Sequence, residues 1–236
     1  MPAQQPSGAL PLYLQISEML IRDIASGRLP RGTRLPPERE MAKSLDTSVG
    51  TLRKSLAKLE KKGLLERRHG SGNYVRGSSA PEGIYALYRL ELLEGGGLPT
   101  ARILDVQRLP KPADLPEFGA SIEGHRIRRL RFLGGKPASV EEIWLDGSYA
   151  DRLDADHLSH SLYLYYRKAL GLWITGFRDS VGVDAAPEWS PPEFAPAPGT
   201  LCGCVTRHSH ARDGGVAEVS RNWFDSDVAR YVARMR

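Results

Sequence analysis

The sequence predicts a two-domain α+β protein, in which a small helical domain with a β-hairpin precedes a larger antiparallel sheet with helices. Apolar residues recur every three to four positions over residues 12–62 and at strand-like intervals from residue 100 onward. A run of small residues at 77–83 separates the two patterns and is typical of a linker. A chain of 236 residues can form two cores, and we place the domains at 1–77 and 78–236.

Three helices are expected in the first domain. The first begins at Pro11, where the missing N–H of proline costs nothing, and ends before Gly27. The second spans residues 37–45 after a loop rich in proline and glycine, and the third spans residues 49–62. The inward side of the third helix carries leucines at helical spacing, at Leu52, Leu56 and Leu59.

A short basic hairpin follows the third helix. Residues 64–68 and 73–76 are predicted strands, and the turn between them contains His69 and Gly70. Arg67 and Arg68 make the first strand basic. Two helices joined by a tight turn and followed by a basic β-wing are typical of domains that hold one helix in the major groove of DNA.

The charge distribution separates the two domains. Residues 1–77 carry 14 Lys and Arg against 7 Asp and Glu, a net charge of +7, whereas residues 78–236 carry 19 against 21, a net charge of −2. Basic charge confined to one domain favours contact between that domain and phosphate groups.

The second domain shows strand-like runs joined by short turns, the pattern of an antiparallel sheet. Strands are expected at residues 100–109, 125–133, 138–145, 173–183, 201–210 and 216–224. Helices are expected at residues 112–119 and 159–170.

Four blocks of the first domain resemble the winged helix-turn-helix of the GntR family of bacterial repressors. They are PLYLQI, LPPEREMA, SVGTLRKSLAKLEKKGLL and RHGSGNYV, in the family's order and spacing over residues 10–76. The resemblance implies contacts with double-stranded DNA by Arg39, Ser48, Val49, Gly50, Thr51, Arg53, His69 and Gly70. Arg67 and Arg68 are added as phosphate contacts that read no sequence.

Two positions depart from the family pattern. Pro37 stands where many members have serine, which removes the capping-box hydroxyl, and Val49 stands where many have arginine. Direct readout of bases therefore rests more on Arg39 and Arg53. The alternative for Arg53 and His69 is an ordinary solvated helix charge and a turn residue without contact.

The second domain resembles the UTRA effector-binding domain of the HutC subfamily, whose fold is like that of chorismate lyase. The blocks that carry the resemblance are RIRRLRFLGGKPASVEEIWL, SLYLYY and AEVSRNWF, within residues 83–226. The resemblance implies a small-molecule site formed by Arg129, Arg131, Glu141, Ser161, Glu218 and Phe224, for an effector that carries phosphate or carboxylate. Phe224 stands where the family often has tyrosine, so one hydrogen bond to a ligand is lost.

The residues themselves leave two readings of this site open. Arg129 and Arg131 lie two apart on a strand and therefore share one face. Two buried guanidinium groups need an anion or a carboxylate beside them. That partner is either an effector or the protein's own Glu141 and Glu218, in an internal ion-pair network without a ligand. Arg178 is a weaker candidate ligand.

No metal and no cofactor are expected. Cys202 and Cys204 flank one glycine, so a disulfide between them would be strained, and two thiols are too few for structural zinc. Reduced thiols are the expectation for a cytosolic protein. His208 and His210 share a strand face, but a surface pair is favoured over a metal site because no third ligand has useful spacing.

Together these observations predict a cytoplasmic, homodimeric repressor, without catalytic residues or enzymatic activity. It would bind an operator with two half-sites and be released by a small anionic metabolite. No signal-peptide pattern is present, and no apolar run reaches the roughly 18 residues that span a bilayer, so no membrane contact is expected. Two alternatives stay open: a lyase-fold enzyme domain fused to a DNA-binding head, and an architectural DNA-binding protein without a sensor.

Overall fold

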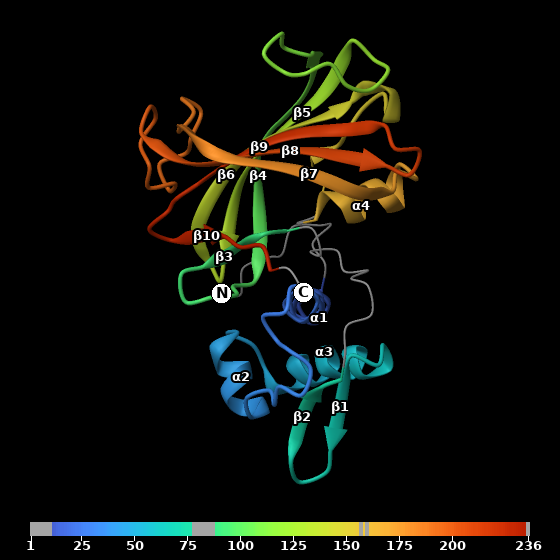
Figure 1. The fold of residues 1–236 in the computed structure, drawn as a ribbon, viewed down its shortest axis with the longest axis vertical. Coiled ribbons are helices and arrows are strands. Elements are labelled where there is room, and N and C mark those ends of the chain that lie inside the picture. The colour runs from blue at the N-terminus through green and yellow to red at the C-terminus, as the bar shows by residue number, and fades with distance from the viewer. Residues whose placement is uncertain (1–10, 77–87, 156–157, 159–160, 235–236) are drawn as a thin grey trace. The chain divides into compact units, whose positions relative to one another are not determined.

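The computed structural model describes residues 11–76, 88–155, 158 and 161–234, and the chain divides into two compact units (Figure 1). The described residues 11–76, 88–99 and 231–234 form one unit, which we call the head. The described residues between 100 and 230 form the other, which we call the sheet unit. The predicted linker at 77–83 lies outside the described residues, and the domain boundary after residue 77 stays a prediction.

The head contains the predicted winged helix-turn-helix. Helices α1 (Leu12–Ala25), α2 (Glu38–Ser44) and α3 (Val49–Lys61) enclose an apolar core. Ile16, Leu20, Leu52 and Leu59 are at most 1% exposed in that core. Strands β1 (Leu65–Arg68) and β2 (Gly72–Val75) pair antiparallel as the wing, with Arg68 opposite Gly72.

The head also contains two segments that the sequence pattern did not assign to it. Strand β3 (Leu90–Leu92) lies in this unit, and the Val232 N–H donates to the carbonyl oxygen of Arg89 at 2.9 Å. Residues 15–24 of α1 are all buried. A helix that only lined one core would keep a solvated side, so α1 is covered on more than one side.

The sheet unit is built on six antiparallel strands in the order β4-β5-β6-β9-β8-β7 (Figure 1). Their bounds are β4 (Pro99–Pro110), β5 (Glu123–Leu133), β6 (Lys136–Asp146), β7 (Ile174–Ala185), β8 (Leu201–Ala211) and β9 (Val216–Phe224). All six predicted strands are confirmed. Short elements η1 (Gly147–Tyr149) and β10 (Ala229–Tyr231) were not predicted.

One helix covers part of this sheet. Helix α4 (Leu162–Ala169) lies within the predicted range 159–170, and Leu162 and Tyr166 pack with Ile127 and Ile143 of the sheet. Within the described part of the chain, no helix is long and apolar enough to cross a membrane.

The predicted helix at 112–119 is wrong. The segment is a turn, in which the Leu115 N–H donates to the carbonyl oxygen of Pro112 at 3.1 Å. Pro116 lacks the N–H that a helix would need four residues after Pro112, and its ring would clash with that carbonyl. Gly119 has φ +65° and ends the segment in the left-handed region.

The same turn is fastened by a buried carboxylate. Asp146 is fully buried and accepts from Lys111 Nζ at 2.5 Å and from the Ser121 N–H at 3.1 Å. Burial alone would raise the pKa of Asp146, but these hydrogen bonds and those of Ser148 lower it from 3.8 to about 2. The charged form is therefore favoured in the folded state.

We predict that Asp146→Asn lowers the free energy of unfolding near neutral pH by about 2 kcal/mol. Because the folded-state pKa is depressed, this contribution is present above the ordinary value of 3.8 and is lost as the pH falls toward about 2. Urea denaturation of wild type and variant from pH about 7 to about 2 measures it, with exposed Asp151→Asn as the control. A difference that is independent of pH would contradict the account.

Candidate nucleic-acid interface and ligand site

The recognition helix α3 starts with a capped turn. Ser48 is its N-cap, and its side chain accepts from the Thr51 N–H at 3.1 Å. The two hydroxyl oxygens lie 2.9 Å apart. Ser48 and Gly50 are exposed, and Val49 and Thr51 are partly exposed, so this helix end is open to solvent. Pro37 caps α2 without a side-chain hydrogen bond, as expected from the missing serine.

A basic hollow of about 580 Å³ lies between α2, α3 and the wing. It brings together six of the predicted DNA contacts: Arg39, Arg53, Arg67, Arg68, His69 and Gly70. The other four, Ser48, Val49, Gly50 and Thr51, are not part of its lining. The predicted contacts therefore fall into two groups on the head, the basic hollow and the uncharged, open end of α3.

Glu38 organises the arginines of this hollow and was missed by the sequence analysis. Its carboxylate accepts from Arg53 Nε at 2.6 Å and lies 3.5 Å from Arg67 Nη2. The hydrogen bond from Arg53 is the main reason that the pKa of Glu38 is lowered. Because Arg53 is held through Nε, its two Nη groups stay available for a forked contact with guanine or phosphate.

The wing is stiffened by its own contacts. The guanidinium of Arg68 lies over the ring of Tyr74 at 4.5 Å, and the Tyr74 hydroxyl lies 2.8 Å from Ser71 Oγ. Gly70 has φ +69° at the tip, and a side chain there would be strained whatever the space around it.

The predicted ligand residues converge on one face of the sheet. The register sets Arg129 opposite Glu141 and Glu141 opposite Asn222, and it sets Ser139 between Arg131 and Phe224. Alternate residues of a strand share a face. Arg129, Arg131 and Glu141 are each less than 8% exposed.

Glu141 is the centre of the ion pairs on this face. It pairs with the guanidinium of Arg129, lies 3.5 Å from Arg131 Nη1 and accepts from Asn222 Nδ2 at 3.3 Å. Burial alone would raise the pKa of Glu141, but the two arginines lower it below its ordinary value. In this structure the internal pairing that the sequence left open is therefore formed for these three residues.

Glu218 has different partners. Its carboxylate accepts from the hydroxyls of Tyr166 at 2.7 Å, Ser209 at 3.0 Å and Tyr163 at 3.1 Å. Burial raises its pKa, and these hydrogen bonds offset only part of that effect. Glu218 is 2% exposed, so it is a buried hydrogen-bond acceptor, and the nearby charge of Arg129 also favours its ionised form.

Two further predicted residues lie elsewhere in the sheet unit, at the start of α4 and at the end of β9. Ser161 is the buried N-cap of α4, and no cap hydrogen bond of its side chain is formed. The ring of Phe224 lies against Gly203, where a Cβ atom would fall 2.2 Å from the ring. Glycine at 203 therefore allows the ring to lie flat on β8.

Arg207 and Asp179 lie on the same sheet face and were not predicted as site residues. Arg207 donates to Asp179 through Nε and Nη2, both at 2.7 Å, and lies 4.1 Å from the ring centre of Phe177. Strand alternation was the available signal, because Arg207 shares its face with Ser209. His208, one of the two histidines weighed as a metal ligand, lies on the opposite face.

No metal site is formed in the described part of the chain, where no group of three or more His, Cys, Asp or Glu side chains is suitable. Cys202 and Cys204 are free and buried, as predicted. Burial is the main cause that raises the pKa of Cys204 to about 12, so this thiol stays protonated.

The chain matches two families of known proteins. Residues 12–75 match bacterial regulatory proteins of the gntR family, and residues 94–230 match the UTRA domain. The UTRA match covers more than half of the chain. The protein therefore belongs to the GntR family of transcriptional regulators and carries a UTRA effector domain, as the sequence resemblance predicted.

Individual relatives agree with this assignment. The chain is 59% identical to the HTH-type transcriptional regulator SmoD of Agrobacterium fabrum over 97% of this chain and 98% of the relative. It is 24% identical to the HTH-type transcriptional repressor NagR of Bacillus subtilis, over 96% and 95%. Among solved structures, Bacillus subtilis YydK superposes with a TM-score of 0.55 at 21% identity, over 96% of this chain and all of that one, and thus shows the same fold.

We predict that Glu38→Gln lowers the discrimination between specific and non-specific DNA. Arg53 would lose the negative charge of its partner and be held less firmly, at a cost of about tenfold in the specificity ratio, while loss of one negative charge would strengthen binding to any duplex. Fluorescence anisotropy compares an operator duplex, selected by the wild-type protein from random DNA, with a scrambled duplex of equal length.

Glu60→Gln provides the matched control, because Glu60 is an exposed residue of α3 outside the basic hollow. It should leave the ratio of the two affinities unchanged. An unchanged ratio in Glu38→Gln as well would remove Glu38 from the interface.

Proposed function

We propose that this regulator is a cytoplasmic repressor without enzymatic activity, released from its operator by a small anionic metabolite that carries phosphate or carboxylate. The proposal rests on one observation: two groups of arginines differ in their exposure to solvent. Arg53 and Arg67 are about 60% exposed in the basic hollow, whereas Arg129 and Arg131 are 4% exposed on the sheet. Exposed arginines suit polyanionic DNA, and buried ones suit one small anion.

The ten predicted DNA contacts and the six predicted effector contacts are part of this proposal. An incoming anion would compete with Glu141 for Arg129 and Arg131, and the ring of Phe224 would offer an apolar surface beside it. The relative NagR is named a repressor, and so is the histidine utilization repressor of Pseudomonas putida. These names support repression, and not activation, of transcription by this protein.

The protein is proposed to act as a homodimer on an operator with two half-sites. Support comes from strand β7, which is the last strand in the order of the sheet. Val181 and Val183 are 55% and 74% exposed on it, and Leu201, 72% exposed, stands opposite its end. An unpaired apolar edge is suited to a second copy of the chain.

Val183→Lys should convert the dimer to a monomer, because it places a charge within the exposed apolar side chains of Val181, Val183 and Leu201. Sedimentation equilibrium of the full chain measures the change. Ser180→Lys, whose side chain lies on the other face of the same strand, is the control and should keep the dimer. Operator affinity should fall together with dimerisation. A dimer that is unaffected by Val183→Lys would place the interface elsewhere.

The two-site proposal predicts opposite phenotypes for two arginines. Arg53→Ala should abolish binding to the selected operator duplex and leave binding of anions intact, because only the head is altered. Arg131→Ala should keep operator binding and lose the response to anions. Anisotropy measures the first property, and a thermal-shift screen of the full chain with sugar phosphates and small carboxylates measures the second.

A screen in which no anion raises the melting temperature of the wild-type protein would favour the sensorless alternative. Turnover of a binding compound would favour the enzyme alternative. An unchanged response in folded Arg131→Ala would show that the ligand residues are wrongly assigned.

A further inference from the structure

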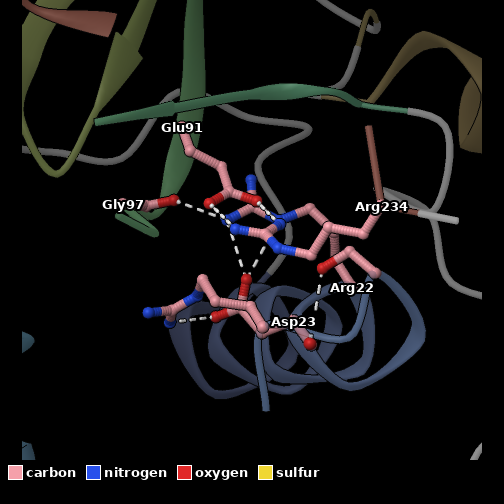
Figure 2. A network of polar contacts seen from close by, with 7 residues as sticks. Arg22, Asp23, Glu91, Gly97 and Arg234 are labelled. Atoms are coloured by element: carbon pink, nitrogen blue, oxygen red, sulfur yellow. Dashed lines mark hydrogen bonds and ion pairs between the residues drawn. The ribbon is translucent and has the colours of Figure 1, made fainter. Parts of the chain in front are cut away.

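A cluster of charged side chains, three of them buried, joins α1 to the two segments of the head that lead, along the chain, to and from the sheet unit (Figure 2). We call it the α1 ion cluster, and its members are Arg22, Asp23, Arg28, Glu91 and Arg234. Glu91 comes from β3, a few residues before β4 begins at Pro99. Arg234 lies shortly after β10.

Asp23 is the fully buried centre on α1. Its carboxylate pairs with Arg22 Nη2 at 3.1 Å and with Arg28 Nη2 at 2.5 Å. Arg22 is 2% exposed and reaches onward, donating from Nη2 to the carbonyl oxygen of Gly97 at 3.2 Å. The helix is therefore linked through one guanidinium to the segment that enters β4.

The C-terminal segment supplies the second link. Arg234 forms a forked pair with Glu91, at 2.6 Å and 3.0 Å (Figure 2). Burial alone would raise the pKa of Glu91, but Arg234, Arg22 and Arg28 lower it, so the carboxylate stays charged. The incoming and outgoing segments are thereby tied to each other beside α1.

A glycine loop is shaped to this cluster. Gly95, Gly96 and Gly97 all have positive φ, of +89°, +70° and +93°. A Cβ atom at Gly96 would fall 2.9 Å from the guanidinium carbon of Arg28. The loop thus follows the guanidinium closely, and its three positive φ angles favour glycine at each position.

Stability alone is a weak reason for such a cluster. Buried ion pairs are often no more stabilising than apolar side chains of the same volume, although removing one partner is costly. The cluster also fixes the relative positions of three chain segments. Its pairs form only when α1, the segment around β3 and the segment after β10 lie in one arrangement. A joint of this kind has discrete states.

The strand that bears the ligand residues leads directly to this joint. Glu218, Asn222 and Phe224 lie on β9, and only residues 225–233 separate Phe224 from Arg234. Asp225 braces that connection, since its N–H donates to the Ala138 carbonyl at 3.0 Å and its carbonyl accepts from the Ala229 N–H at 2.9 Å.

On the head side, α1 contacts the recognition helix. Ser55 Oγ donates to the carbonyl oxygen of Tyr13 at 2.9 Å, and Ser17 Oγ donates to that of Ser55 at 3.3 Å. A change in the position of α1 would therefore be transmitted to α3 through these hydrogen bonds.

We infer that the α1 ion cluster is the joint that couples the ligand site to the DNA-binding surface. The inference rests on the proposed function, which supplies the two states to be coupled. Movement at the end of β9 shifts Arg234, releases Glu91 and makes Arg22 and Arg28 pair anew around Asp23. Coupling is reciprocal, so operator binding at the head must also alter the sheet unit.

Hydrogen exchange of the full chain tests this without an identified effector. Amide exchange is measured with and without the selected operator duplex in wild type, Arg234→Met and Glu91→Gln. In wild type, the operator should protect α3 and also change exchange in β4 and β9. In both variants the effect on α3 should remain, with operator affinity within about threefold of wild type, and the effect on β4 and β9 should be lost.

Arg230→Met is the matched control. It lies in the same segment, is exposed, and its guanidinium donates to the carbonyl of its neighbour Ala229. This variant should keep the operator effect on β4 and β9. Arg234→Met retains the alkyl stem of a side chain that is one-third exposed, so its folding is expected to be preserved.

The outcomes separate the inference from the function on which it rests. If wild type and Arg234→Met both transmit the operator effect to β4 and β9, the joint is overturned and the proposed function stands. If Arg234→Met also loses protection of α3, the cluster serves the fold of the head, and the joint is again overturned. If the operator changes amide exchange only in the head of the wild-type protein, the two units are not coupled. That result would contradict the proposed ligand-responsive function, and the joint with it.

Discussion

Both compact units bury guanidinium and carboxylate groups away from water, and each buried charge needs a partner of opposite sign close by. In the head the need is met around Asp23, whose partners come from α1 and from the loop that follows it. In the sheet unit it is met around Glu141, whose partners stand opposite it in register on β5 and β9. These ion pairs therefore determine which chain segments lie side by side, and they allow fewer arrangements than apolar packing alone would.

The same residue type serves two kinds of chemistry because its surroundings differ. Arg53 and Arg67 project into solvent and are steadied by one carboxylate, that of Glu38, which leaves most of their donors available. Arg129 and Arg207 are enclosed by aromatic rings, hydroxyls and carboxylates, so groups within the fold already interact with their charges. A polyanion can approach the first pair from outside, whereas only a small anion that enters the fold could compete for the second group.

The sequence was sufficient for the elements that depend on local pattern. Helical spacing located α1, α2 and α3, and the family blocks placed Arg39, Arg53 and His69 around one hollow. Local sequence pattern did not predict the features that depend on other constraints, such as a proline or a partner residue far away in the sequence. The proline at 116 outweighed the helical appearance of residues 112–119, and Glu38 and Arg207 gained their roles from partners 15 and 28 residues away. The hydrogen bond from Arg22 to the carbonyl oxygen of Gly97 joins positions 75 residues apart, which no spacing within α1 can reveal.

The most direct test of the account is a measurement of linkage on the full wild-type chain. The dissociation constant of the selected operator duplex is determined with and without each anion that raises the melting temperature, and the dissociation constant of that anion is determined with and without the duplex. The account predicts that one anion weakens operator binding, and that the operator weakens binding of that anion by the same factor. An anion that binds the sheet unit while both constants stay unchanged would contradict it.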